Sequence, residues 1–412
     1  MSKKTVADID VKGKKVLMRC DFNVPLDENC NITSDTRIVA ALPTIKAILD
    51  KGGCVILMSH LGRPDGEKVA KYSLAPVAKK LGELLGKDIL FANDCIGPEV
   101  KKKAAALKPG DCLLLENVRF HKEEEIKDKN AKENPALRKA KDDFAKQIAV
   151  LGDVYVDDAF GTAHRDNASM YTVPVMMQGK DRVAGFLLEK ELKFLGETLD
   201  SPKKPFVAIL GGAKVSDKLK VIENLMKKVD RILIGGAMAY TFFKAMGLTV
   251  GKSLCEDDFV DKAKQLLADA KNGKCELVLP TDSVITQKVE ANAANKIVPG
   301  GIPEGWMAVD IGPDAVKSFA KKLEGAKTVV WNGPMGIFEM PPFDEGTKAV
   351  AQAVAKATDA GAISVIGGGD SASAIKKLGL SKRVSHVSTG GGASLEFLEG
   401  KKFVCLEVLD EK

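Results

Sequence analysis

Residues 206–214 read Phe-Val-Ala-Ile-Leu-Gly-Gly-Ala-Lys, an apolar run followed by a glycine turn that ends in lysine. Five consecutive apolar residues bounded by glycine are typical of a strand buried on both faces of a parallel sheet. Glycine lets a ligand approach the backbone, and Lys214 adds a positive charge where the next helix begins. This segment predicts a strand, a turn and a helix that meet at the carboxyl edge of a sheet.

The same order of apolar run, polar or glycine turn, and longer helical spacing recurs along the chain. The runs begin near residues 16, 55, 89, 113 and 154 in the first half, and near 206, 232, 277, 329 and 363 in the second. Strands that alternate with helices are typical of parallel sheets with crossover helices. We therefore expect an α/β fold of two doubly wound, Rossmann-like domains with mainly parallel sheets.

A helix between the two halves marks the expected domain boundary. One helix face is indicated by Leu188, Leu192, Leu195 and Leu199, and the segment Ser-Pro-Lys-Lys-Pro at 201–205 ends the helix. An ordinary crossover helix is the alternative interpretation. We expect a first domain at 1–184, an interdomain helix at 185–200 and a second domain at 201–390, with a cleft between the domains.

Composition excludes several classes of protein. The chain has 412 residues, of which 45% are hydrophobic, and 62 Lys plus Arg against 56 Asp plus Glu give a net charge of +6. That charge is too small to indicate nucleic-acid binding. No apolar run approaches the ~18 residues that a membrane span needs, and the first 15 residues are too polar for a secretory signal, so we expect a cytoplasmic protein. The eight cysteines contain no CxxC pair and are predicted to be reduced thiols.

Basic residues follow the predicted strands of the first half. They are Arg19, His60, Arg63, Arg119, His164 and Arg165, with Arg37 at the start of a helix. Each arginine alone is explained by a surface salt bridge, but their repetition at strand ends predicts a basic pocket for a small substrate with several negative charges. The charged stretch 121–141 is interpreted as a solvated loop and helix face without chemistry, with Asn134-Pro135 at a helix start.

Glycine clusters follow the strands of the second half. They lie at 211–212, 235–236, 333–336, 367–369 and 390–392. Tight turns explain any one cluster, whereas their repetition favours backbone N–H groups that bind the phosphates of a nucleotide. Lys214 and Lys218 lie one helical turn apart and suit phosphate binding. Asp370 either holds Mg²⁺ together with phosphate oxygens or caps a helix.

Two familiar phosphate motifs are missing. No GxGxxG follows a strand, which argues against a dinucleotide-dependent dehydrogenase. Residues 247–253 are one residue short of a Walker A loop and do not follow a strand-like run, so we assign them no phosphate role.

Seven segments in combination resemble the phosphoglycerate kinase family. They are Arg-Cys-Asp-Phe-Asn-Val-Pro (19–25), Ser-His-Leu-Gly-Arg-Pro (59–64), Asp-Ala-Phe-Gly-Thr-Ala-His-Arg (158–165), Gly-Gly-Ala-Lys-Val-Ser-Asp-Lys (211–218), Trp-Asn-Gly-Pro-Met-Gly (331–336), Gly-Gly-Gly-Asp-Ser (367–371) and Ser-Thr-Gly-Gly-Gly-Ala-Ser (388–394). They occur in the family's order and extend from about residue 5 to residue 400. Cys20, Ala308 and Ser371 depart from the residues that are frequent in the family.

The resemblance implies a reversible, Mg²⁺-dependent phosphoryl transfer between 1,3-bisphosphoglycerate with ADP and 3-phosphoglycerate with ATP, carried out by a cytoplasmic monomer. The residues implied to bind the triose are Asp21, Phe22, Asn23, Arg37, His60, Leu61, Gly62, Arg63, Arg119 and Arg165. Those implied to bind the nucleotide are Gly212, Ala213, Lys214, Lys218, Gly236, Ala308, Asn332, Pro334, Glu339, Gly368, Gly369, Asp370 and Ser371. Arg37, Lys214 and Lys218 are the expected catalytic residues, and Asp370 is the expected metal ligand. The chain end after about residue 390 is expected to pack on the first domain.

The substrate's own carboxylate is the expected nucleophile in the ATP-consuming direction, so no general base is required. Direct in-line transfer is expected on hinge closure. A non-catalytic, two-lobed anion- or nucleotide-binding protein is the alternative. A coupled assay for ATP consumption with 3-phosphoglycerate separates it from the kinase.

Overall fold

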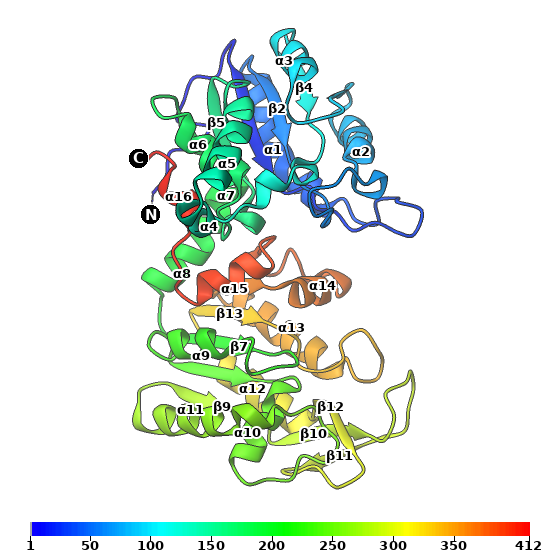
Figure 1. Ribbon diagram of the computed structural model, residues 1–412. Coiled ribbons are helices and arrows are strands. Elements are labelled where there is room, and N and C mark those ends of the chain that lie inside the picture. The colour runs from blue at the N-terminus through cyan, green and yellow to red at the C-terminus, as the bar shows by residue number, and fades with distance from the viewer. Residues whose placement is uncertain (1) are drawn as a thin grey trace. The chain divides into compact units, whose positions relative to one another are not determined.

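A computed structural model describes residues 2–412, apart from the side chains of residues 197 and 198; residue 1, where the predicted first domain begins, lies outside it. The chain forms two compact units (Figure 1). The first unit comprises residues up to Leu192 together with Lys402–Lys412, and the second comprises Lys193–Lys401. Within the described residues, every helix is too short or too polar to cross a bilayer.

A six-stranded parallel sheet forms the centre of the first unit, in the order β3-β4-β2-β1-β5-β6. Its strands are β1 (Lys15–Cys20), β2 (Cys54–Met58), β3 (Leu90–Phe91), β4 (Cys112–Leu114), β5 (Val154–Asp158) and β6 (Arg182–Ala184). Val16 pairs with Val55 on one side and with Val154 on the other. Apolar runs that are buried on both faces explain why this sheet could be predicted.

Helices connect these strands. They are α1 (Thr36–Asp50), α2 (Ala75–Leu85), α3 (Pro98–Ala105), α4 (Asp128–Glu133), α5 (Pro135–Ala149), α6 (Val173–Met176), α7 (Phe186–Glu191) and α16 (Val404–Glu407), with short turns η1 (Ala70–Tyr72), η2 (Val118–Phe120), η3 (Lys122–Glu125), η4 (Phe160–Thr162) and η5 (Ala168–Thr172). Ile45 of α1 and Leu81 of α2 share a core with alternate residues of the strands, such as Val16 and Met18. The side chain of Asn134 accepts hydrogen bonds at the first turn of α5, which confirms the predicted helix start.

The second unit contains a second six-stranded parallel sheet, in the order β15-β14-β13-β7-β8-β9. Its strands are β7 (Phe206–Leu210), β8 (Arg231–Ile234), β9 (Glu276–Val278), β13 (Thr328–Asn332), β14 (Ile363–Gly367) and β15 (His386–Val387). The predicted α/β class with two parallel sheets is therefore confirmed. A three-stranded antiparallel sheet was not predicted; it consists of β10 (Asp282–Thr286), β11 (Asn295–Pro299) and β12 (Met307–Ile311).

Helices also connect the strands of the second unit. They are α8 (Glu197–Asp200), α9 (Leu219–Leu225), α10 (Met238–Ala245), α11 (Val260–Asn272), α12 (Pro313–Leu323), α13 (Glu345–Asp359), α14 (Gly369–Lys377) and α15 (Gly392–Leu398), with η6 (Leu192–Gly196) and η7 (Asp257–Phe259). Phe319 of α12 and Val354 of α13 pack in one core with Ile209 and Trp331 of the sheet.

Strand order reverses once in each sheet. In the first unit the chain moves outward from β1 in one direction and then continues from β5 on the other side. In the second unit the reversal lies between β7 and β13. Ligands of open α/β sheets bind outside the carboxyl ends of the strands at such reversals, so each unit has one topologically favoured site.

The connection between the units is helical over 186–200, in the three segments α7, η6 and α8. The compact units differ from the predicted division at the end of the chain. Residues 392–398 form α15, which belongs to the second unit and accepts a hydrogen bond of 2.7 Å from Asn224 at the Leu398 carbonyl. The chain rejoins the first unit at Lys402. Within this last segment, Asp410 Oδ2 accepts a hydrogen bond of 2.9 Å from Arg182 N. The expectation that residues after about 390 pack on the first domain stays a prediction, and the compact units differ from it in placing α15 with the second unit. The functional domain limits 1–184 and 201–390 stay predictions.

Gly185 gives a stability test of the first unit. A Cβ at this position would overlap the carboxylate of Asp158, which is buried and held by a hydrogen bond of 3.0 Å from Leu188 N. We expect Gly185→Ala to lower the free energy of unfolding by about 1–3 kcal/mol, as other overpacking substitutions do. Denaturant unfolding measures the change. Gly196→Ala is the matched control, because a Cβ at 196 meets no atom within 4 Å; equal stability of the two variants would contradict the overlap.

Candidate functional site

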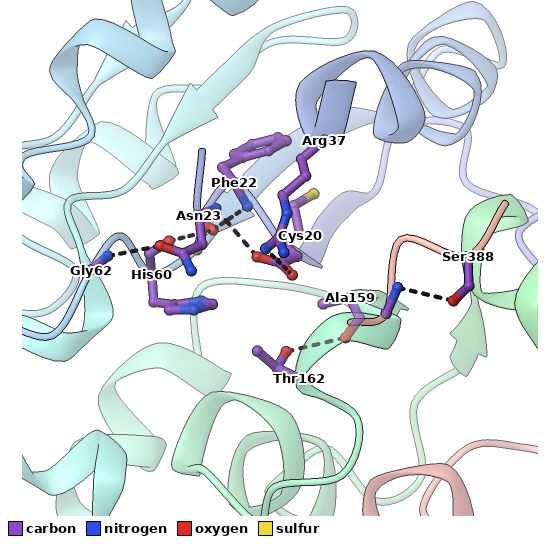
Figure 2. A network of polar contacts seen from close by, with 12 residues as sticks. Cys20, Phe22, Asn23, Arg37, His60, Gly62, Ala159, Thr162 and Ser388 are labelled. Carbon is purple, nitrogen blue, oxygen red and sulfur yellow. Dashed lines mark hydrogen bonds and ion pairs between the residues drawn. The ribbon is translucent and has the colours of Figure 1, made fainter. Parts of the chain in front are cut away.

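In the first unit, hydrogen bonds join the segments that follow β1 and β2 (Figure 2). Asn23 Oδ1 accepts a hydrogen bond from Gly62 N at 2.9 Å. Phe22 N donates to Ser59 Oγ at 2.8 Å. The two strand ends predicted to bind a substrate are therefore held beside each other by side chains of the predicted site.

Arg37 lies on the first turn of α1 and is fixed by an ion pair. Its Nη1 lies 2.7 Å from Asp21 Oδ2. The Arg37 side chain is 32% exposed and that of Asp21 only 10%. A guanidinium with five N–H donors that is about one third exposed and oriented by a carboxylate of low exposure is suited to bind an anion from solvent.

His60 lies among several positively charged arginines of this unit. It is buried, and Arg19 Nη2 lies 3.2 Å from its Nδ1. Because arginine only donates, Nδ1 accepts and the ring proton lies on Nε2. Burial lowers the pKa of His60 well below its ordinary value, and the charges of Arg19, Arg119, Arg37 and Arg165 lower it further. His60 is therefore a neutral hydrogen-bond donor in a cluster of cations.

Arg19 is held in place by a network of buried hydrogen bonds. Its Nε donates to Ser169 Oγ at 2.8 Å, and Ser169 Oγ donates to Glu124 Oε1 at 2.6 Å. Glu124 is fully buried, and burial raises its pKa. Sequence analysis missed Glu124 and Ser169. Glu124 lies in the charged stretch that was interpreted as solvated, and nothing in its spacing distinguishes it from exposed neighbours.

The remaining residues predicted for the triose lie around the same strand ends. Arg119 Nη1 donates to the Gly62 carbonyl at 2.8 Å. Burial lowers the pKa of Arg119 below its ordinary value; the charge of Glu125 opposes this shift and that of Arg165 adds to it. Leu61 is buried, whereas Arg63 is exposed. The structure thus brings together the arginines that act on His60 and leaves Arg63 at the edge.

In the second unit, two cavities lie at the reversal of strand order. One, of about 520 Å³, is lined by Gly212, Ala213, Lys214, Lys218, Asn332, Pro334, Gly368, Gly369, Asp370 and Ser371. The other, of about 360 Å³, is lined by Gly212, Ala213, Gly236, Ala308, Pro334, Glu339 and Asp370, among others. Every residue predicted for the nucleotide lines one of them.

Close backbone contacts between β7 and β13 explain the glycines of this site. A Cβ on Gly211 would overlap the Pro334 carbonyl oxygen, and Gly333, at φ +97°, passes equally close to Gly211. Gly333 N donates to Ser371 Oγ at 2.6 Å, and Lys218 Nζ hydrogen-bonds Asn332 Oδ1. Burial lowers the pKa of Lys218.

The smaller cavity has an apolar wall that sequence analysis did not identify. It is formed by Tyr240, Leu254, Met307, Val309 and Phe338. Lys252, in the segment set aside as an incomplete Walker A loop, also lines this cavity. An apolar wall beside phosphate-type donors suits the flat ring of a base. The wall comes from separate elements, so only the folded chain reveals it.

Asp310 also lines the smaller cavity and is buried. It accepts hydrogen bonds from Gly346 N at 2.6 Å and from Ile311 N at 2.9 Å. Burial raises its pKa to about 8, with a smaller contribution from Asp344 and Glu345. A carboxyl group that is neutral at pH 7 therefore lies beside this cavity.

Asp370 is the residue with the chemistry of a metal ligand in this unit. It is exposed on the first turn of α14 and lines both cavities. No hydrogen bond to its carboxylate is found among residues 2–412. A free carboxylate beside phosphate-type donors fits a hard divalent cation such as Mg²⁺.

Comparisons with known proteins identify one family. The sequence model of the family described as "Phosphoglycerate kinase" matches residues 6–401. A phosphoglycerate kinase of Chlorobium phaeobacteroides (strain BS1) is 54% identical over all of both chains, and one of Chloroherpeton thalassium is 56% identical over 98% of each. The solved phosphoglycerate kinase structure from Coxiella burnetii superposes with a TM-score of 0.86 at 40% identity over 98% of each chain. The one from Pyrococcus horikoshii gives 0.82 at 31% identity over 98% of each.

The raised pKa of Asp310 predicts a pH dependence of stability. The folded state favours the neutral carboxyl group of Asp310. The contribution of this group to the free energy of unfolding is therefore complete below about pH 4 and is lost as the pH rises to about 8. We expect the free energy of unfolding of the protein, minus that of Asp310→Asn, to fall over this range by up to about 1.4 kcal/mol per pH unit. Urea unfolding at several pH values measures it. Asp261→Asn, at a side chain that is 97% exposed, is the control, and a constant difference for Asp310→Asn would contradict the prediction.

Proposed function

This chain belongs to the phosphoglycerate kinase family, and from that premise we propose how its residues divide the work of phosphoryl transfer. The protein transfers a phosphoryl group between ATP and the carboxyl group of 3-phosphoglycerate, in a reversible reaction of glycolysis and gluconeogenesis. A non-catalytic binding protein is not favoured, because the match extends over residues from both units.

We propose that the basic cluster of the first unit binds the triose. Asp21, Phe22, Asn23, Arg37, His60, Leu61, Gly62, Arg63, Arg119 and Arg165 are assigned to it. The support is electrostatic, because arginines from four separate segments lower the pKa of one buried histidine. Neutral His60 offers Nε2–H as a donor, and guanidinium groups supply the charge that a carboxylate and a phosphate require.

We propose that the cavities of the second unit bind ATP or ADP. The observation that carries this proposal is that all the residues assigned to the nucleotide line these two cavities, where β7 and β13 end. Backbone N–H groups and the lysines suit phosphates, whereas the apolar wall suits the base.

The chemistry needs positioning more than proton transfer. The carboxylate of 3-phosphoglycerate is already ionised at neutral pH, so it attacks without a general base. What remains is alignment of two polyanions and neutralisation of the transferring group. Arg37, Lys214 and Lys218 are the residues that we assign to this task. In-line transfer on hinge closure stays a prediction.

Mg²⁺ with the nucleotide is the cofactor that we propose. Asp370 would hold it, since its exposed carboxylate lines both cavities. When bound, the ion neutralises phosphate charge. We also propose that the protein acts as a monomer in the cytoplasm; light scattering on the purified chain tests the oligomeric state.

Lys214 offers the sharpest test of the assignment. Lys214→Ala should lower kcat by about 10²–10³-fold, as loss of one donor to a developing charge does in other enzymes. A coupled assay that follows ATP consumption in the presence of 3-phosphoglycerate measures it.

Lys220→Ala is the matched control, since Lys220 is an exposed lysine of α9. Near-normal turnover of Lys214→Ala would overturn the catalytic role of this lysine alone. No ATP consumption that depends on 3-phosphoglycerate in the unmodified protein would contradict the function itself.

A further inference from the structure

Three side chains with metal-binding atoms gather where β3 and β4 end, in a place that neither proposed ligand uses. Asp94 and Cys95 follow β3, and His121 lies between η2 and η3, after β4. One ligand atom from each lies within 4.8 Å of the others. Because β3 and β4 are parallel neighbours, their carboxyl ends share one edge, which explains why segments 26 residues apart meet here.

Cys95 is the buried member of this cluster. It is 1% exposed, and its Sγ makes no hydrogen bond within the described part of the chain. Burial raises the pKa of its thiol well above the ordinary value, and the negative charges of Asp94, Glu124 and Glu116 contribute. An unpartnered sulfur atom in a field of carboxylates is a site where a cation would be stabilised.

Asp94 and His121 are already oriented. Asp94 Oδ1 lies 2.7 Å from His121 Nε2 and accepts hydrogen bonds from Cys95 N at 2.6 Å and, more weakly, from Ile96 N at 3.4 Å. The His121 ring packs against Phe144, with centroids 5.3 Å apart. The side chain of Asp94 is 46% exposed and that of His121 is 24% exposed, so an ion can reach the cluster from solvent.

We propose that Asp94, Cys95 and His121 form a binding site for a divalent transition cation of the zinc type. One sulfur, one nitrogen and one oxygen ligand, completed by water, is a four-coordinate set that suits Zn²⁺, and the sulfur makes it unsuitable for Mg²⁺. Ligand atoms in a zinc tetrahedron are about 3.4 Å apart. The Asp94–His121 hydrogen bond must therefore lengthen by about 0.7 Å as the cation replaces the proton between them. The thiol proton passes to solvent, and His121 binds the cation through Nε2 as the neutral tautomer whose proton lies on Nδ1.

Cobalt is a suitable probe, because a thiolate bound to Co²⁺ absorbs in the near ultraviolet and tetrahedral Co²⁺ absorbs strongly in the visible. We expect the full-length, metal-free protein titrated with Co²⁺ to gain both bands at one ion per chain. Zn²⁺ should abolish them, and a millimolar excess of Mg²⁺ should not. Cys95→Ser should lose the near-ultraviolet band, and His121→Gln and Asp94→Asn should each weaken affinity by at least about 10–100-fold, the loss that removal of an outer-shell partner alone causes.

Cys255→Ser is the matched control, since this thiol also has a carboxylate neighbour, Asp257, but belongs to the other unit. Circular dichroism of each variant without metal checks folding, and the partly exposed His121→Gln keeps the test valid if Cys95→Ser does not fold. Absence of the thiolate band in the unmodified protein would overturn the proposal and leave a hydrogen-bonded Asp94–His121 pair only. Bands that persist in Cys95→Ser, or that vanish in Cys255→Ser, would overturn it by placing the ion elsewhere.

Discussion

Close approach of adjacent parallel strand ends is the constraint on which both candidate ligand sites depend. In the second unit it is visible at atomic level, because Gly211 and Gly333 pass so near each other that a side chain at either would overlap the backbone opposite. That closeness directs backbone N–H groups toward one space. In the first unit, side chains do the same work, since Asn23 binds the backbone of Gly62 and joins two strand ends.

The two sites solve the problem of anion binding by different means. The first unit concentrates formal charge in a buried place, and burial first, with neighbouring arginines second, lowers the pKa values of His60 and Arg119. The buried carboxylate of Glu124 compensates part of the charge through Ser169 and Arg19. The second unit relies on backbone dipoles with few formal charges beside an apolar wall, which is the arrangement that a nucleotide with both phosphates and a base requires.

The sequence predicts those features that depend on local patterns. Ten parallel strands follow from apolar runs, and the arginine and glycine segments follow from what succeeds each run. The antiparallel sheet was missed because β11 (Asn295–Pro299) is mostly exposed and has only two consecutive strand-forming apolar residues, Ile297 and Val298, so it lacks the signal of a buried strand. Glu124 and the cavity wall at Met307 and Val309 were missed because their environment comes from distant parts of the chain. The compact unit that α15 joins could not be predicted, because a short amphipathic run carries no signal of which core it will join.

The first unit is discontinuous, and this has a consequence for its synthesis. Its last contributions come from residues 402–412, which pair with Lys4 and Arg182. A ribosome completes the second unit, 193–401, before these residues emerge. The amino-terminal part of the protein is thus translated first but finished last, and throughout elongation it exposes the backbone of Arg182 at the edge of β6, which Asp410 later covers. This interval is when a nascent chain of this topology most depends on chaperones and is most open to proteases.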